Sequence, residues 1–337
     1  MTSPVSDRGI EDSLETSHLK DASLNVGPPD ALAQIPRFAG PSTFARLPRL
    51  DQIARTDVAI LGVPFDSGTT YRPGARFGPE AIRAASKLLR PYHIGLGVEP
   101  WVQQQVADAG DVAVTPFDIA AAVGQIEIAA RALYTSADRI IALGGDHTIA
   151  LPMLRAAHEQ FGPVALVHFD AHLDTWDSVF GSSLAHGTPF RRAAEEGLLS
   201  VDQCMHVGIR HSTPSTKDFD EDTALGFATI TTLDIARYGV EHAASRIRER
   251  VGDQPMYVSI DVDVLDPAHA PGTGTPEPGG LTTRELQLLL FALADMQVVG
   301  ADVVEVSPAY DHAQITALAA AGITFDLLAM LATGHRG

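Results

Sequence analysis

Three side chains that could bind a metal ion or move a proton follow one apolar segment at intervals of two residues. The segment is "VALVHF" (164–169), and the residues after it are Asp170, His172 and Asp174. Side chains two residues apart in an extended chain point to the same face, so two carboxylates and an imidazole are expected side by side. The end of a buried strand does not need such a group, and we therefore expect it to have a chemical role.

Similar residues follow three other apolar segments that have the character of strands. They are Asp146 and His147 after "RIIALGG" (139–145), Asp261 and Asp263 after "MYVSI" (256–260), and Glu305 after "VVGADVV" (298–304). Ligands of open parallel sheets bind beyond the carboxyl ends of the strands, because helices cover the two faces. Four strands are therefore expected to bring acids and imidazoles to one edge of one sheet.

Carboxylates gathered at one place repel one another unless a cation neutralises them. Four carboxylates and two imidazoles exceed the four ligands of one zinc ion and suit two ions that share carboxylates. The set is rich in oxygen and contains no thiolate, which favours two Mn²⁺ per chain, with Ni²⁺ as the alternative. The six expected ligands are His147, Asp170, His172, Asp174, Asp261 and Asp263.

Several residues near these motifs have an ordinary structural explanation. Asp146 precedes an expected helix, where an Asp most often acts as a cap. His168 has the parity of Asp170 but lies deeper in its strand, so we expect a hydrogen-bonded core histidine rather than a ligand. His186 precedes an expected helix that begins near Thr188, so its ordinary structural explanation is a loop histidine. Five other histidines are expected in helices or loops without acidic partners, and most are expected to be solvated or structural: His93, His158, His211, His269 and His312.

These residues are positioned by strands and helices that alternate from Thr56 onward. Apolar segments typical of doubly buried strands alternate with segments typical of helices, which predicts an α/β fold of three αβα layers around a parallel sheet. We expect one catalytic domain over 36–337, preceded by a flexible tail over 1–35. The expected strands are 57–65, 139–145, 164–170, 205–210, 255–262 and 298–308, and the expected helices are 78–90, 117–134, 148–162, 240–252, 281–296 and 315–331.

Composition excludes several classes of protein. The 337 residues carry a formal net charge of −18, which argues against nucleic-acid binding and mildly favours cationic small molecules. The single cysteine, Cys204, cannot form an internal disulfide. The chain has no run of 18 apolar residues, and its N-terminus lacks the apolar segment of a secretory signal. We therefore expect no membrane span and a cytoplasmic location.

The motifs that contain these residues resemble those of the ureohydrolase family, the arginases and agmatinases. The matching motifs are "YRPGARFGP" (71–79), "GGDHT" (144–148), "FDAHLD" (169–174), "SIDVDVLDPAHAPGTGTPEPGG" (259–280) and "VEVSPAYD" (304–311). The resemblance extends from about residue 56 to the C-terminus. It implies an arginase-like fold, two manganese ions, a homohexamer or homotrimer, and hydrolysis of a guanidino group to urea and an amine.

The resemblance also implies a role for each matching residue. Glu305 corresponds to the acid that receives the guanidinium, His186 in "HGTPF" to a proton shuttle, and Asp174 to the residue that orients the hydroxide. The chemistry agrees, because a guanidinium is a poor electrophile that needs activated water, and the leaving nitrogen needs a proton. One ion is expected to take His147, Asp170, Asp174 and Asp261, and the other Asp170, His172, Asp261 and Asp263, so that Asp170 and Asp261 bridge.

The tail of the substrate is less constrained than the reaction. Thr213 stands where arginases have an acid for the α-amino group of arginine, which disfavours arginine. Agmatine has an amine tail and 4-guanidinobutyrate a carboxylate tail, and Arg72 or His211 would suit the carboxylate. The negative charge of the chain slightly favours agmatine, which would be hydrolysed to putrescine, over 4-guanidinobutyrate, and smaller guanidines rank below both. The sequence resembles the agmatinase-like branch of the family.

Two other classes of protein compete with this hypothesis. A metal-dependent deacetylase has a similar fold, but it typically uses one zinc ion bound by two Asp and one His, and Glu305 would have no role in it. A non-catalytic subunit of a hetero-oligomer is expected to have lost metal ligands, whereas all six are present here. Release of urea by the isolated chain distinguishes the three hypotheses.

Overall fold

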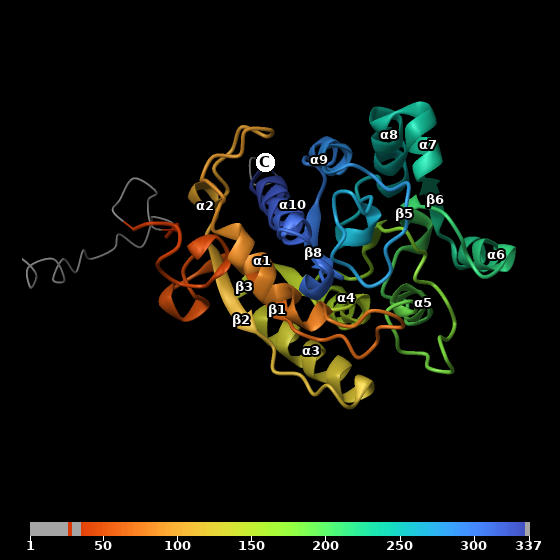
Figure 1. The fold of residues 1–337 in the computed structure, drawn as a ribbon, viewed down its shortest axis with the longest axis horizontal. Coiled ribbons are helices and arrows are strands. Elements are labelled where there is room, and N and C mark those ends of the chain that lie inside the picture. The colour runs from red at the N-terminus through yellow and green to blue at the C-terminus, as the bar shows by residue number, and fades with distance from the viewer. Residues whose placement is uncertain (1–25, 29–34, 334–337) are drawn as a thin grey trace, which may run out of the picture.

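A parallel sheet of eight strands forms the centre of the computed structural model, which describes residues 26–28 and 35–333. The strands lie in the order β2-β1-β3-β8-β7-β4-β5-β6 (Figure 1), and every neighbouring pair is parallel. Their bounds are β1 Thr56–Val63, β2 Val106–Asp111, β3 Ala137–Gly144, β4 Ala165–Phe169, β5 Met205–Ile209, β6 Ala228–Thr231, β7 Met256–Asp261 and β8 Val298–Val304.

Helices cover both faces of this sheet (Figure 1). Ala59 and Leu61 of β1 face a core shared with α3, α4 and α5, whereas Val58 and Ile60 face the core under α1, α8, α9 and α10. Successive strand residues thus point to opposite helical layers, which confirms the predicted three-layer α/β fold. The helices are α1 Gly78–Ser86, α2 Pro100–Gln103, α3 Ile119–Leu133, α4 Ala150–Phe161, α5 Pro189–Glu195, α6 Thr216–Leu225, α7 Thr232–Tyr238, α8 Val240–Val251, α9 Thr283–Ala292 and α10 Ile315–Thr333.

The middle of the sheet consists of β3, β8, β7 and β4, which are neighbours in space although they are far apart in the sequence. These are the four strands whose carboxyl ends carry the acids and imidazoles that the sequence singles out. Parallel pairing places all four ends at one edge of the sheet. The topology therefore creates one site from four separate motifs.

The helix α10 is long and apolar enough to cross a membrane by length and composition alone, with a mean hydropathy of 1.9. In the fold, 83% of that window is buried, and the helix packs against α1, α9 and β8. A helix that is apolar all round and enclosed by protein is typical of a core.

The structure contains elements that the sequence did not predict, among them β2 and β6. The strand β2 has an unusual composition because Asp108 and Asp111 bind Arg83, at 2.8 Å and 2.5 Å. The predicted strand over 298–308 ends earlier, at Val304, because the next residue, Glu305, has a left-handed backbone with φ of 66°. Such a conformation interrupts a strand.

The tail expected over 1–35 lies outside the described residues except at 26–28 and at Ile35. Where it is described, the backbone N–H of Val26 donates to Gln105 Oε1 (2.7 Å), and Gln105 Nε2 donates to the Val26 carbonyl (3.0 Å). Those two bonds hold the chain at Val26 beside the start of β2. The domain boundary at residue 36 stays a prediction.

Candidate metal centre and active site

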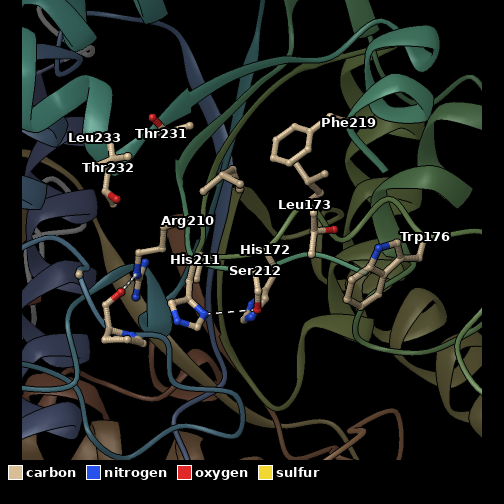
Figure 2. Close-up of a pocket in the computed structure, with 15 residues that line it drawn as sticks. His172, Leu173, Trp176, Arg210, His211, Ser212, Phe219, Thr231, Thr232 and Leu233 are labelled. Carbon is tan, nitrogen blue, oxygen red and sulfur yellow. Dashed lines mark hydrogen bonds between the residues drawn. The ribbon is translucent and has the colours of Figure 1, made fainter. Parts of the chain in front are cut away.

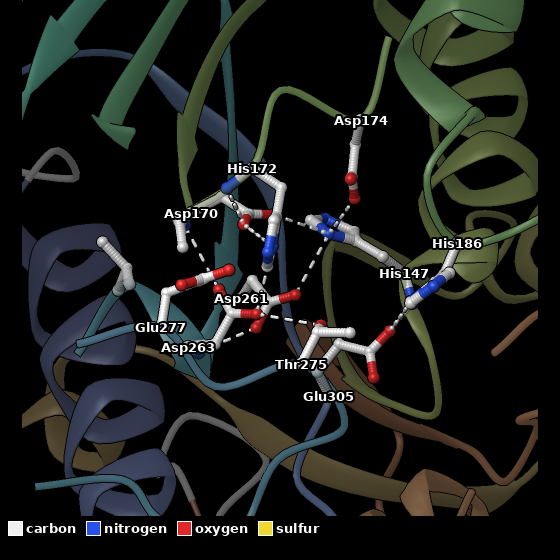
Figure 3. A network of polar contacts seen from close by, with 12 residues as sticks. His147, Asp170, His172, Asp174, His186, Asp261, Asp263, Thr275, Glu277 and Glu305 are labelled. Atoms are coloured by element: carbon white, nitrogen blue, oxygen red, sulfur yellow. Dashed lines mark hydrogen bonds and ion pairs between the residues drawn. The ribbon is translucent and has the colours of Figure 1, made fainter. Parts of the chain in front are cut away.

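All six expected metal ligands lie together beyond the ends of β3, β4 and β7 (Figure 3). Five of them are buried, and the side chain of His172 is 18% exposed. Two groups of possible ligand atoms each lie within 4.8 Å of one another, and they share Asp170: His147, His168, Asp170 and Asp174 in one, and Asp170, His172 and Asp263 in the other.

The first expected ion position lies beside Nδ1 of His147. Three carboxylate oxygens surround this nitrogen: Oδ2 of Asp174 at 3.0 Å, Oδ2 of Asp170 at 3.2 Å and Oδ2 of Asp261 at 3.5 Å. The nitrogen is buried and has no hydrogen-bond partner. The other ring nitrogen, Nε2, lies 2.8 Å from the hydroxyl of Ser259, which fixes the ring orientation. An unpartnered nitrogen amid three carboxylates fits a divalent cation.

The second position lies between His172, Asp170 and Asp263. Nδ1 of His172 is 3.1 Å from Asp170 Oδ1 and 3.2 Å from Asp263 Oδ2. Asp170 therefore presents one oxygen to each position, as expected of a bridging ligand. Asp261 directs Oδ2 to the first position, and its Oδ1 accepts a bond from the backbone N–H of Asp263 (2.8 Å). The bridging role of Asp261 stays a prediction.

Burial and crowding set the charges of this cluster. Burial, together with the charges of Asp263 and Asp170, raises the pKa of Asp261 well above its usual value. Burial also raises the pKa of Asp263, to about 6, although His172 opposes the shift. For His147 burial lowers the pKa, but the surrounding carboxylates outweigh it and raise the value well above normal. Buried and crowded carboxylates stay ionised only with positive charge near them, which two divalent ions would supply.

His168 lies close enough to belong to the first group, but both of its ring nitrogens already have partners. Nε2 is 2.8 Å from Asp170 Oδ2, and Nδ1 is 2.7 Å from Nδ1 of His206. His168 is fully buried, which confirms the prediction of a hydrogen-bonded core histidine. Asp146 likewise acts as the expected cap, because its side chain accepts bonds from the backbone N–H groups of Thr148 (3.0 Å) and Gly68 (2.7 Å).

Glu305 lies beside the cluster with one carboxylate oxygen in use and one free of partners. Oε1 accepts a bond from the backbone N–H of His147 (2.9 Å) and lies 3.0 Å from Nδ1 of His186. Oε2 is buried without a hydrogen-bond partner, and a Cβ added at Gly274 would lie only 3.4 Å from it. Together with Asp174 (φ 54°), Glu305 holds a left-handed backbone conformation. Such conformations persist at functional sites when the surroundings fix them.

His186 connects Glu305 with Thr70, in the loop between β1 and α1. Its Nε2 is 2.7 Å from the hydroxyl of Thr70, and its Nδ1 faces Glu305. Burial lowers the pKa of His186, but the Glu305 carboxylate outweighs this and raises it to about 9. The imidazole is therefore placed to carry a proton beside the cluster.

A cavity of about 410 Å³ lies next to the metal centre, and His172, an expected metal ligand, also lines this cavity (Figure 2). Figure 2 shows Trp176 and Phe219 on one side of it and His211 and Ser212 nearer the middle. The wall is largely apolar, and its polar groups are hydroxyls, the imidazoles of His172 and His211, and Arg210, whose guanidinium already donates to backbone carbonyls. Of the two residues expected to suit a carboxylate, only His211 lines the cavity, because the Arg72 guanidinium lies over two tyrosine rings.

Sequence reasoning missed several partners of the site residues. Glu277 binds His211 (2.8 Å), and Figure 3 shows its carboxylate pointing toward the cluster. His93 binds Asp326 (2.8 Å). The expectation that His93 and His211 lack acidic neighbours is therefore wrong, because the acids come from distant segments. Glu277 could have been found from the sequence, because it lies in the "TPEP" turn of a motif that matches the family, and an acid there is a candidate site residue. Nothing near His93 in the sequence indicates Asp326.

A buried cluster of four carboxylates and two imidazoles, with a free carboxylate oxygen and an imidazole beside it, defines a site of the binuclear metal hydrolase type. Comparison with known proteins gives the family. Residues 56–330 match the model of the arginase family. The chain belongs to the arginase family of ureohydrolases, hydrolases that act on guanidino groups.

Individual relatives support this membership over most of the chain. Guanidinopropionase of Pseudomonas aeruginosa is 45% identical over 301 residues, which cover 89% of this chain and 94% of that protein. Agmatinase of Chromobacterium violaceum is 41% identical, with 87% and 89% covered. The structure of proclavaminate amidino hydrolase from Streptomyces clavuligerus superposes with a TM-score of 0.86 at 43% identity and covers 89% of this chain and all of that one.

Proposed function

We propose that this protein hydrolyses the guanidino group of a small linear guanidino compound to urea and an amine. The observation that carries the proposal is Oε2 of Glu305, a buried carboxylate oxygen without a hydrogen-bond partner beside a cation-binding cluster. Oε1 already has the His147 N–H and His186 as partners, and a buried oxygen without a partner, such as Oε2, is costly unless a ligand donates to it. A planar guanidinium matches a carboxylate in shape and charge.

The cluster is proposed to hold two Mn²⁺ ions through His147, Asp170, His172, Asp174, Asp261 and Asp263. Two divalent ions bound there supply a hydroxide nucleophile near neutral pH, because they lower the pKa of water from about 15.7. The donor set of oxygens and two imidazoles suits Mn²⁺, and Ni²⁺ is the alternative. Elemental analysis of active protein tests the identity and number of the ions.

The other residues of the site divide the remaining work. Asp174, which faces the first ion position, is placed to accept a hydrogen bond from the nucleophile and orient it. His186 is placed to give a proton to the nitrogen that leaves, since its raised pKa keeps it protonated at neutral pH. Glu305 holds the guanidinium so that its carbon faces the cluster. The three roles follow the resemblance and agree with the distances.

The cavity favours a substrate whose tail is a carboxylate, that is, a guanidino acid such as 4-guanidinobutyrate. Among the described residues, no acid lines the cavity. Two acids are bonded to lining residues, Glu277 to the His211 imidazole and Asp218 to the Thr213 hydroxyl, so that His211 would exchange Glu277 for a bound carboxylate. A carboxylate could receive a bond from His211 and from nearby hydroxyls, whereas an ammonium would lose its hydration without an unpaired anion to replace it.

Agmatine is the second candidate, for two reasons. The chain has a net charge of −18, which attracts cations. One relative at 41% identity is named an agmatinase. In this alternative the ammonium would compete with His211 for Glu277. The expected homohexamer or homotrimer and the cytoplasmic location are part of the proposal too, and light scattering and cell fractionation test them.

A substrate panel tests the proposal directly. Purified protein loaded with Mn²⁺ is given 4-guanidinobutyrate, 3-guanidinopropionate, agmatine, arginine and guanidine, and urea release is measured for each. We expect the highest kcat/KM for a guanidino acid. Highest activity on agmatine would make agmatine the first candidate and the guanidino acid the second. If no compound releases urea, the proposal of a guanidino hydrolase is refuted, and a deacetylase or a non-catalytic subunit becomes the hypothesis to test.

A further inference from the structure

A line of buried side chains extends from the metal centre to the helix α6. Asp170 Oδ2 lies 2.8 Å from His168 Nε2, His168 Nδ1 lies 2.7 Å from His206 Nδ1, and His206 Nε2 lies 3.1 Å from Asp222 Oδ1. All four residues are at most 1% exposed. The reaction proposed above uses none of the last three.

The two imidazoles are held rigidly between the layers. β4 and β5 are paired so that His168 lies opposite His206, which puts both rings on one face of the sheet. Phe190 packs on His168 with ring centroids 4.3 Å apart, and Phe227 stacks on His206 at 4.7 Å. With both nitrogens of each ring partnered and an aromatic ring against each, neither imidazole can turn without breaking contacts.

Asp222 reaches the metal loop by a second route. Its Oδ1 also accepts a hydrogen bond from the hydroxyl of Thr175 (2.8 Å). Thr175 directly follows Asp174, whose left-handed backbone has φ of 54°. One carboxylate oxygen thus connects to two expected ligands, to Asp170 through two imidazoles and to Asp174 through the adjacent residue.

The burial of Asp222 is unusual for its helix. Within α6, all of which the structure describes, Asp222 is the only buried residue. Three positions earlier, Phe219 lines the cavity. A short surface helix normally docks through an apolar stripe, but this helix is joined to the sheet by a carboxylate. Burying an acid and two imidazoles costs free energy that apolar side chains would not cost.

We propose that Asp222 is a positioning residue of the metal centre: through His206 and His168 it orients the Asp170 carboxylate, and through Thr175 it fixes the turn that carries Asp174. Partners of metal ligands orient the ligands and tune the affinity of the site. Because α6 also presents Phe219 to the cavity, the same carboxylate joins the wall of the substrate cavity to the metal cluster.

The test measures Mn²⁺ binding as well as activity. Asp222→Asn is compared with Asp220→Asn, a matched change at an exposed position of the same helix. We expect Asp222→Asn to weaken Mn²⁺ binding by about 10–100-fold, measured by release of Mn²⁺ to a chelator, and to lower kcat with little change in KM. Asp220→Asn is expected to leave both unchanged. Equal Mn²⁺ affinity in the two variants would overturn the proposal.

Two further variants separate the routes and keep the test valid if Asp222→Asn fails to fold. Thr175→Val removes only the hydroxyl contact, and His206→Phe keeps a ring beside Phe227 but breaks the line to Asp170. Weaker Mn²⁺ binding in both supports both routes. Weakening in Thr175→Val alone refutes the imidazole route, weakening in His206→Phe alone refutes the Thr175 route, and no weakening in either refutes the proposal.

A separate variant tests the claim that α6 contributes Phe219 to the wall of the cavity. Phe219→Ala is expected to raise KM while Mn²⁺ binding stays normal, because Phe219 touches the cavity and none of the ligands. The inference rests on the proposed two-ion site but not on the substrate. A wild-type protein that binds two Mn²⁺ but releases no urea would refute the proposed reaction, and the metal-affinity comparison would still decide the role of Asp222.

Discussion

The metal centre and the cavity beside it are built from different parts of the fold. The cluster sits at the ends of three central strands with Glu305 at the end of a fourth, and its side chains are almost all buried and bonded to backbone or to one another. The cavity is walled by the loop over 209–213, by the loop after β4 and by the starts of α6 and α7. Among its polar residues His211 and Ser212 are exposed, and the side chain of His211 is 53% exposed.

Because the two regions are built differently, the reaction and the choice of substrate depend on different residues. Ligands on strand ends cannot shift without moving the sheet, so the chemistry is fixed by the most rigid part of the molecule. Loop residues can change without disturbing it, which is how one scaffold serves several substrates. The comparison predicts that changes in the cluster abolish turnover, whereas changes in the cavity redirect it.

The largest effect is expected from Asp170→Asn. Asp170 presents one oxygen to each ion position, and an amide nitrogen cannot replace either. We expect loss of both ions and of urea release, a larger effect than the roughly 10–100-fold typical of residues one step removed from the metal. Elemental analysis provides the measurement. Asp146→Asn is the control, since Asp146 caps a turn and should cost stability alone; the opposite pattern would mean that the ligands are misassigned.

Glu305→Gln comes next. The change keeps the size of the side chain but removes the charge that a guanidinium needs. Losing one partner of a desolvated ion pair costs about 3–5 kcal/mol, or roughly two to four decades in kcat/KM. Metal content is expected to stay normal. If this variant instead loses an ion, Glu305 is a ligand and the argument for a guanidinium substrate fails.

His186→Ala is expected to act on kcat. Loss of a general acid usually lowers turnover by about 10²–10⁴-fold, and the variant should retain both ions because His186 contacts Glu305 and Thr70 rather than the ligands. Steady-state urea release with elemental analysis gives both quantities. Turnover at the wild-type rate would identify His186 as the structural loop histidine.

The smallest effect, and the one that tests the cavity, is expected from His211→Gln. A hydrogen bond to a charged group contributes about 1.5–3 kcal/mol, so KM for a guanidino acid should rise by roughly tenfold or more. KM for agmatine should not rise. Arg72→Gln serves as the control, because the Arg72 side chain lies outside the cavity lining. An equal change in KM for both substrates would show that His211 does not distinguish a carboxylate tail from an ammonium tail.

The cluster could be predicted from the sequence because the chemical types of its residues stand out directly after apolar strands, and a parallel sheet brings such strand ends together. The expected extended geometry of Asp170, His172 and Asp174 was wrong, because β4 ends at Phe169 and Asp174 has a left-handed backbone with φ of 54°. Asp222 could not be predicted in this way. It comes from a helix whose pattern is otherwise polar, and it meets His206 only because of how α6 packs.

The same reason explains the other missed features. His93 and Asp326 are 233 residues apart and meet through packing of α10. β2 is hard to recognise because its acids, Asp108 and Asp111, pair with Arg83 of the distant helix α1. Sequence patterns report local geometry, whereas ion pairs between distant elements depend on the tertiary fold.

The position of β8 has a consequence for how the protein is made. This strand is the last to leave the ribosome, yet it lies between β3 and β7 in the middle of the sheet. Before it arrives, the nascent chain can form β2-β1-β3 and β7-β4-β5-β6 only as two half-sheets. His147 follows the first and Asp170 and Asp261 belong to the second. Because domains complete such distant pairings late, loading with metal should follow release of the finished polypeptide rather than accompany translation.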